Sequence, residues 1–199
     1  EGYLGEADSI RRDSAVNAHK KWVLAAKHLG CHSIRVNAHG EGTAEEVSAH
    51  VVKGLTVLSQ FAAQHGINVI VENHGGYSSN GAWLADVMKK VNLPNCGTLP
   101  DFGNFCLKRE GGVMWGKPCL EEYDRYKGIE ELLPFAKGVS AKSYDFDAQG
   151  NDTKIDYKKM LDLVKASQYT GFIGVEYEGE IDAEIEGIKK TKALIEKNW

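Results

Sequence analysis

Several features that mark other classes of protein are missing from this sequence of 199 residues. No apolar run approaches the roughly 20 residues that a membrane-spanning helix needs, and no basic segment followed by an apolar stretch marks a signal peptide. Lysine and arginine number 24 against 28 aspartate and glutamate residues, so the net charge is −4. Nucleic acids and anionic membranes usually require a basic face. We therefore expect a cytoplasmic protein with neither partner, any signal peptide lying ahead of the given sequence.

Cysteine and histidine are also sparse. The four cysteines, Cys31, Cys96, Cys106 and Cys119, form no C-x-x-C pair, and a domain of this size rarely needs disulfides. We expect reduced and mostly buried thiols. None of the seven histidines follows His74, which disfavours a zinc site built from several histidines.

Short strands alternate with amphipathic helices along the whole chain. A helix precedes the first strand and another follows each strand, because apolar residues recur there at helical spacing. A polar, glycine-rich loop is expected over residues 105–119, and the next helix over 129–135. The predicted strands cover residues 33–38, 68–74, 97–101, 139–144 and 172–177.

Strict β-α alternation implies parallel strands joined by right-handed crossovers. Two α/β folds fit this pattern, namely a doubly wound open sheet and part of an eight-stranded barrel. Strands of an open sheet are covered on both faces and read as continuous apolar runs. Here Ser33, Arg35 and Asn37 instead place polar groups on one face of a strand, and other strands do the same. The alternation favours a barrel with a polar interior near its mouth, in a single domain over residues 1–199.

Charged residues gather where the predicted strands end, which is the end of a barrel that carries its active site. The segments VIVENHGG, LPDFGN, VSAKS and IGVEYEG place Glu72, Asp101, Lys142 and Glu176 on four successive strands. In order, spacing and position, these segments resemble the xylose isomerase-like sugar phosphate isomerase/epimerase superfamily. The resemblance covers nearly the whole chain.

The resemblance implies a (β/α)8 TIM barrel of xylose isomerase-like type, of which this chain supplies about five strands, equivalent to the fourth to the eighth. The sequence begins with Glu1 rather than methionine. We expect that the native protein is longer and that its first three strands are missing here, or that the arc is completed by another chain.

The resemblance also implies roles for individual residues. Glu72, Asp101 and Glu176 correspond to metal ligands, and in the epimerases of the superfamily the two glutamates also move a proton on opposite faces of a sugar carbon. Two positions depart from the family pattern, because the expected histidines are replaced by Ser140 and Asn104. A carboxylate-rich ligand set suits Mn²⁺ or Mg²⁺ better than Zn²⁺ or Co²⁺.

The residue chemistry fits proton abstraction next to a carbonyl. A carboxylate serves as the base, a second one as the acid, and Lys142 adds positive charge near the developing oxyanion. Five further residues are candidates for substrate contacts at the barrel mouth: His74, Asn37, His39, Asn104 and Trp115.

We therefore predict a metal-dependent isomerase or epimerase that acts on a sugar or keto-sugar, with a small carbohydrate as its partner and homo-oligomers possible. Two alternatives stay open. A metal-assisted dehydratase or lyase of the same fold begins with the same proton abstraction, and a non-catalytic sugar-binding barrel would keep the fold alone.

Overall fold

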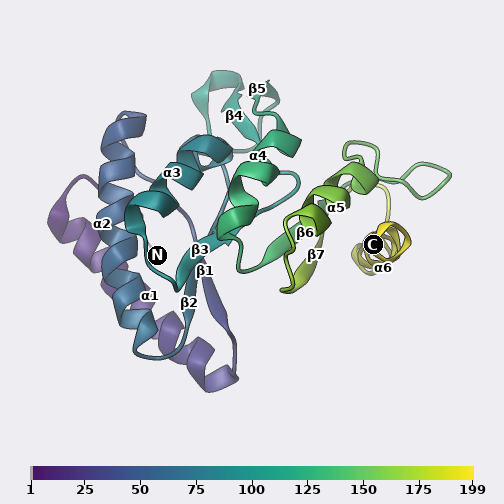
Figure 1. Ribbon diagram of the computed structural model, residues 1–199. Coiled ribbons are helices and arrows are strands. Elements are labelled where there is room, and N and C mark those ends of the chain that lie inside the picture. Colours follow the sequence, from purple (N-terminus) through teal and green to yellow (C-terminus); the bar gives the residue numbers. More distant parts are fainter. Residues whose placement is uncertain (1) are drawn as a thin grey trace.

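The computed structural model describes residues 2–199 and has an arc of parallel strands at its centre (Figure 1). β1 pairs with β2, β2 with β3, and β6 with β7, all in parallel. Parallel bridges from Thr98 to Ala136 and from Asp101 to Ser140 join β3 to β6. The strand order never reverses, as it would in a doubly wound sheet, so the arc is part of a barrel. The strands are β1 (Ser33–Val36), β2 (Asn68–Glu72), β3 (Cys96–Leu99), β6 (Val139–Ser143) and β7 (Ile173–Tyr177).

Helices follow the strands and cover the outer side of the arc (Figure 1). Within residues 2–199, no helix combines the length and apolar content needed to cross a membrane. The α-helices are α1 (Ser9–Leu29), α2 (Ala44–Ala63), α3 (Gly81–Val91), α4 (Arg125–Leu132), α5 (Tyr157–Ala166) and α6 (Glu184–Asn198). Short 3-10 turns occur at η1 (Gly76–Ser79), η2 (Glu110–Gly112) and η3 (Leu133–Phe135).

Side-chain alternation along β2 separates the core from the site. Val69 and Val71 are fully buried in an apolar cluster with residues of α1, α2 and α3. Ile70 and Glu72 point to the opposite, concave face, because successive residues of a strand alternate sides. A second apolar cluster joins α4, α5 and α6 to β6. The predicted polar face of the strands is therefore the inner face of the arc.

Helix ends follow their caps more closely than their apolar periodicity. The predicted capping box of α2 is present, with Thr43 and Glu46 bonded reciprocally. α4 begins at Arg125, earlier than the predicted helix over residues 129–135, because the Asp124 side chain caps it. The first residues of this helix are polar and partly face solvent, so they add no apolar repeat to the sequence.

The loop predicted over residues 105–119 contains an antiparallel hairpin, formed by β4 (Cys106–Arg109) and β5 (Cys119–Glu122). A disulfide joins Cys106 to Cys119 across it. The expectation of four reduced and mostly buried thiols was therefore wrong for this pair. The two cysteines are 13 residues apart in sequence, and only the strand pairing brings them together. Cys31 and Cys96 are free, and Cys31 is exposed.

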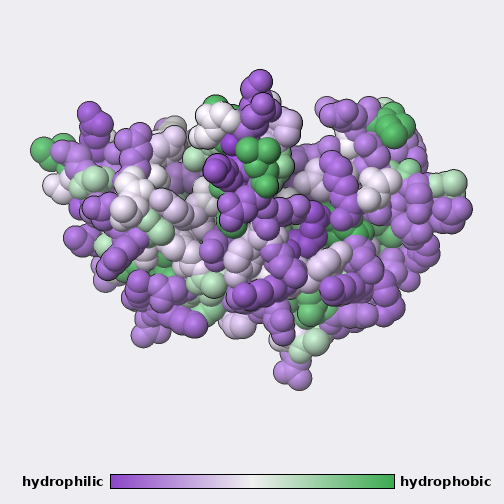
Figure 2. Space-filling model, turned by 90° about the horizontal axis from the view of Figure 1, so that it is seen from above, coloured by the Kyte–Doolittle hydropathy of each residue, from purple (hydrophilic) through white to green (hydrophobic). Residues whose placement is uncertain are grey.

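The hairpin stands beyond the ends of the arc strands, at the top of Figure 1. Figure 2 looks down on this side of the molecule and shows a largely hydrophilic surface with small, separate hydrophobic patches. The hairpin places side chains over the polar ends of the strands.

Removal of the disulfide is expected to loosen the hairpin and leave the arc intact. A cross-link that closes a loop of about 15 residues stabilises it by roughly 3 kcal/mol in the chain-entropy model. In Cys106→Ser/Cys119→Ser, we expect faster amide exchange over residues 106–122 and unchanged exchange in β2 and β6. Cys31→Ser is the matched control, because Cys31 is a free and exposed cysteine. Equal exchange of the hairpin in both proteins would contradict the assignment of the bond.

Candidate active site

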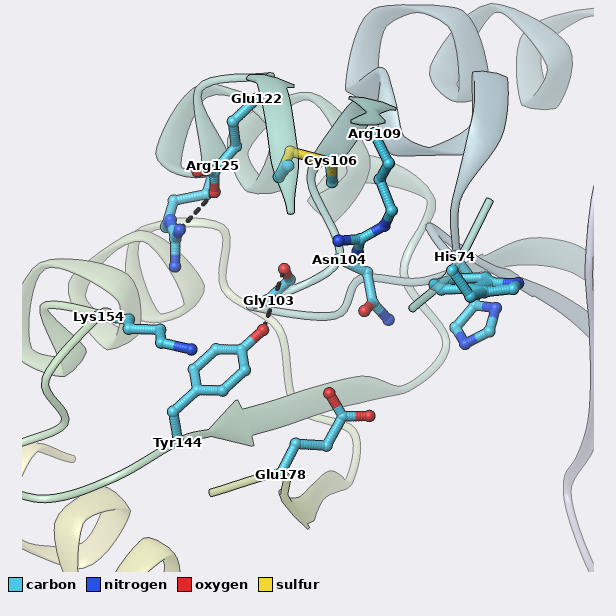
Figure 3. A pocket seen from close by; sticks show the side chains of 12 residues that line it. His74, Gly103, Asn104, Cys106, Arg109, Glu122, Arg125, Tyr144, Lys154 and Glu178 are labelled. Atoms are coloured by element: carbon cyan, nitrogen blue, oxygen red, sulfur yellow. Dashed lines mark hydrogen bonds and ion pairs between the residues drawn. A yellow bond between two sulfur atoms is a disulfide. The ribbon is translucent and has the colours of Figure 1, made fainter. Parts of the chain in front are cut away.

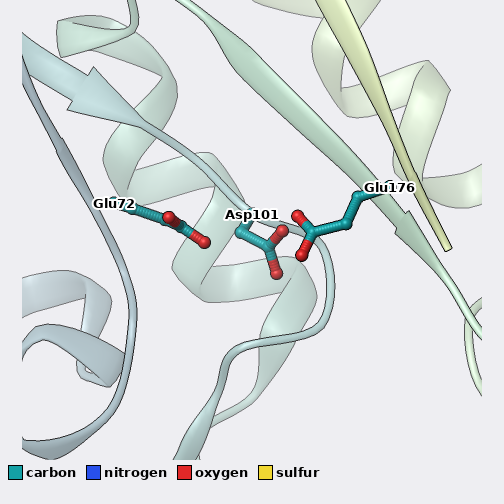
Figure 4. A group of neighbouring side chains, drawn as sticks. All are labelled: Glu72, Asp101 and Glu176. Carbon is teal, nitrogen blue, oxygen red and sulfur yellow. The ribbon is translucent and has the colours of Figure 1, made fainter. Parts of the chain in front are cut away.

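Three carboxylates converge at the inner face of the arc. Glu72 ends β2, Asp101 follows β3, and Glu176 lies in β7. One oxygen from each side chain lies within 4.8 Å of one from each of the others. Figure 4 shows Asp101 in the middle, with Glu72 and Glu176 directed toward it from opposite sides. The structure thus brings together the three residues that the sequence nominated as metal ligands.

Lys142 supplies positive charge inside this cluster. Its side chain is only 1% exposed, and its Nζ lies 3.1 Å from Glu176 Oε1 and 2.9 Å from Glu178 Oε1. Asp101 Oδ1 lies 4.0 Å away. Burial alone would lower the pKa of Lys142, but the charge of Asp101 and the contacts with the two glutamates outweigh it and raise the pKa. The amine is therefore a fixed cation at neutral pH, suited to stabilise an anion and not to act as a base.

Close packing holds Lys142 against the loop after β3. A Cβ atom added at Gly103 would lie 2.6 Å from Tyr144 Oη and 2.7 Å from Lys142 Cδ. Any larger residue at this position would force both side chains away from the loop. Lys142 Nζ also donates a hydrogen bond of 3.2 Å to Asn104 Oδ1. Glycine at position 103 therefore lets the loop, the lysine and the tyrosine share one small space.

Glu72 is held from two sides. The Arg35 guanidinium forms an ion pair with it, and Asn104 Nδ2 donates a hydrogen bond of 2.9 Å to Glu72 Oε1. Burial raises the pKa of Glu72 above its ordinary value, although Arg35 acts in the opposite direction. Asn104, one of the two positions where the resemblance implied a histidine, thus orients Glu72.

The pKa of Glu176 is shifted in the opposite direction to that of Glu72. Burial would raise its pKa, but the charge of Lys142 and hydrogen bonds from Ser140 and Lys142 outweigh burial and lower it. Ser140 Oγ donates a bond of 2.9 Å to Glu176 Oε2. Ser140 therefore contacts Glu176 from the position of the missing histidine. The two glutamates differ in the direction of their pKa shifts, as a general acid and a general base require.

The surroundings of Asp101 indicate whether the three carboxylates could hold a divalent metal ion. Its side chain is completely buried, and burial raises its pKa to about 8 despite the opposing charge of Lys142. Gly103 N donates a bond of 2.9 Å to Oδ1, whereas Oδ2 is buried without a hydrogen-bond partner among the described residues. A buried acceptor without a partner is costly. An all-oxygen set with one such atom fits a hard ion such as Mn²⁺ or Mg²⁺.

A pocket of about 650 Å³ adjoins the cluster on the side of the hairpin (Figure 3). His74, Asn104 and Trp115, three of the predicted substrate-binding residues, line it. The ring centroids of His74 and Trp115 lie 4.4 Å apart, so the hairpin tryptophan covers the histidine at the end of β2. The volume lies in the range of small-molecule sites.

Asn37 and His39 do not line this pocket. Both line a separate hollow of about 430 Å³ near Arg35. The two histidines are nonetheless linked, because His39 Nε2 lies 2.8 Å from the carbonyl oxygen of His74. Direct substrate contact by Asn37 and His39 stays a prediction.

The sequence reading did not nominate several residues that the structure brings to the site. The sequence indicates Arg35 only as part of a polar strand face. In the structure Arg35 forms an ion pair with Glu72 and so holds this carboxylate at the inner face of the arc. The alternation of polar and apolar residues along β1 was the sequence feature that indicated an inward-facing Arg35. The other missed residues line the pocket: Arg109, Arg125, Tyr144 and Lys154.

His74 gives a prediction about pH. Its burial, together with the charges of Arg35 and Lys142, lowers its pKa to about 4. The unfolded chain, with a histidine pKa near 6.5, binds more protons between pH 6.5 and 4, so stability falls as the pH drops through that window. We expect the stability advantage of the wild type over His74→Gln to shrink from pH 7.5 to pH 4.5 in urea titrations. A His74 ring that titrates above pH 6 by NMR would contradict this.

Comparisons with known proteins agree with this fold. A search of curated proteins finds no match. Among solved structures, 3-keto-D-glucoside 4-epimerase YcjR from E. coli aligns with a TM-score of 0.75 and 15% identity, over 99% of this chain and 76% of that one. L-ribulose 3-epimerase gives 0.74 and 13%, over 99% and 72%. A xylose isomerase-like TIM barrel protein from Mycobacterium smegmatis, in complex with magnesium, gives 0.68 and 16%, over 96% and 70%.

At these identities the structural matches show the fold. The family is shown by the sequence itself, because the family model described as "Xylose isomerase-like TIM barrel" matches residues 2–197. The chain belongs to the xylose isomerase-like TIM barrel family.

Proposed function

We propose that this protein is a metal-dependent isomerase or epimerase of a sugar or keto-sugar, which moves a proton next to a carbonyl group. The observation that carries the proposal is the arrangement of Glu72 and Glu176 on opposite sides of Asp101, with pKa values shifted in opposite directions. Two carboxylates placed in this way face a bound carbon from two sides. The epimerases among the structural neighbours support the same class of reaction.

The lowered pKa of Glu176 keeps it ionised, so it removes the proton from the carbon next to the carbonyl. Glu72, whose pKa burial raises, delivers a proton to the opposite face, which inverts the carbon. Lys142 stabilises the negative charge that develops on the substrate oxygen. In the reverse direction the two glutamates exchange roles.

Glu72, Asp101 and Glu176 would hold the metal ion. A bound divalent cation polarises the carbonyl and hydroxyl oxygens of a sugar and lowers the barrier to proton removal. Asn104 and Ser140 orient Glu72 and Glu176 for this ligand set through their hydrogen bonds. The magnesium complex of one structural neighbour supports Mg²⁺ or Mn²⁺ as the ion.

The metal site predicts a simple change in affinity. The protein is expected to bind about one Mn²⁺ per chain, measured by calorimetry and metal analysis after dialysis. Glu72→Gln and Glu176→Gln are expected to weaken binding at least about tenfold, because each loses a charged ligand. Glu196→Gln is the control, since this exposed carboxylate on α6 pairs with Lys192 at the surface. If the wild type binds no ion at millimolar Mn²⁺, the metal-dependent mechanism fails.

Proton transfer predicts an isotope result. With Mn²⁺ and a ketose such as D-fructose in D₂O, NMR is expected to detect deuterium at the carbon next to the carbonyl together with the epimer or isomer. Glu72→Gln and Glu176→Gln are expected to slow this by about 100-fold or more, the usual contribution of a positioned acid or base. Deuterium-free product would exclude proton exchange with solvent. Loss of water from the substrate would instead identify the dehydratase alternative.

A further inference from the structure

Three cationic side chains line the pocket that adjoins the triad. Arg109 comes from β4, Arg125 from the start of α4, and Lys154 from the segment between β6 and α5. Figure 3 shows Arg109 directed downward from the hairpin on one side, and the ends of Arg125 and Lys154 on the other, with Gly103 and Tyr144 between them. Three separate elements thus direct positive charge into one cavity.

The carboxylates that line the pocket are already paired. Glu122 forms an ion pair with Arg125, and Glu178 forms one with Lys142. The remaining lining groups that titrate add no negative charge near neutral pH. Burial raises the pKa of Tyr144 to about 12, which keeps its hydroxyl protonated. The lining therefore keeps a surplus of positive charge.

Two of the cations have no carboxylate partner. Arg109 donates only to backbone carbonyls, from Nε to Met114 at 3.0 Å and from Nη1 to Lys117 at 2.9 Å. Lys154 Nζ lies 3.9 Å from the centre of the Tyr144 ring. In the part of the chain that the structure describes, neither forms an ion pair within 4 Å of a carboxylate.

Arg125 has a donor left over. Its Nη2 pairs with Glu122, whereas Nη1 is buried and has no hydrogen-bond partner in residues 2–199. A buried guanidinium N–H without an acceptor is destabilising, and an anion that accepts from it offsets that cost. Guanidinium groups suit the paired oxygens of carboxylate and phosphate groups.

The cationic end and the triad belong to one site. Asn104 lines the pocket and also bonds to both Glu72 and Lys142. Glu178 lines the pocket and contacts the same Lys142. Asn104 and Glu178 therefore connect the pocket of about 650 Å³, which the arginines line, to the carboxylate cluster.

We propose that Arg109, Arg125 and Lys154 form a subsite for an anionic substituent of the substrate, a phosphate or a carboxylate carried at the end of the carbon chain away from the reacting carbonyl. The orientation of the sugar rests on the proposed function, which places the reacting carbon at Glu72 and Glu176. The affinity for the anion does not rest on it. The substrate class is accordingly an acidic or phosphorylated sugar.

A matched series of ligands tests the subsite. D-fructose, D-fructuronate and D-fructose 6-phosphate share one carbon skeleton and differ only at carbon 6. Binding to the protein, measured by calorimetry at fixed low ionic strength, is expected to be at least about tenfold tighter for one or both anionic members than for D-fructose. The member that gains more affinity identifies carboxylate or phosphate as the natural group. The preference is expected to fall as salt is added, since the cations are accessible to solvent.

Variants test whether the preference for anionic ligands depends on the cations of the pocket. Lys154→Met and Arg109→Gln are each expected to reduce the preference for the anionic ligands over D-fructose by about fivefold or more. Lys158→Met is the control, because this lysine is an exposed residue of α5 whose ion pair with Asp162 lies outside the pocket. Circular dichroism and thermal unfolding verify that each variant is folded.

The outcomes separate the two proposals. Equal affinity for all three ligands, no measurable binding of the anionic pair, or a preference that survives in both variants overturns the subsite. Anion preference without deuterium incorporation into any of the three ligands leaves the subsite standing and removes the proposed function. Turnover of D-fructose without any anion preference supports the proposed function and overturns the subsite.

Discussion

The buried positive charge of Lys142 is the constraint on which the site depends. An ammonium group that is 1% exposed is stable only beside negative partners. Asp101, Glu176 and Glu178 supply them from the loop after β3 and from the end of β7. The lysine therefore ties the last two strands of the arc to the middle of it. The same attraction lowers the pKa of Glu176, which burial would otherwise raise.

Parallel strands in chain order explain why these groups meet. Their carboxyl ends lie at one edge of the arc, so residues far apart in the sequence, such as Glu72 and Glu176, become neighbours there. The inner face of the arc carries the charges, and the helices cover its apolar outer face. The hairpin with its disulfide then adds Arg109 and Trp115 above that edge, where the strands alone would leave the site open. The arc therefore carries the carboxylates, and the hairpin shapes the cavity above them.

Departures from the family pattern have a consistent physical meaning. Ser140 and Asn104 stand where the sequence resemblance implied histidines, and each donates a hydrogen bond to one of the two glutamates. Without an imidazole at these positions, the candidate metal ligands are the carboxylate oxygens of Glu72, Asp101 and Glu176. The prediction that further strands precede this chain stays a prediction, as does the expected location of the protein in the cell.

The sequence by itself determined the local features. Periodicity of two and of 3.6 residues predicted the strands and helices, and the polar strand ends nominated Glu72, Asp101, Lys142 and Glu176. Such signals come from neighbours along the chain. Only the tertiary structure decided which distant groups meet: the pair Arg35–Glu72, the bond between Cys106 and Cys119, and the three cations of the pocket. Loops and exposed side chains carry no periodic signal, because packing against a core does not constrain them. Their contacts depend on where the folded arc places them.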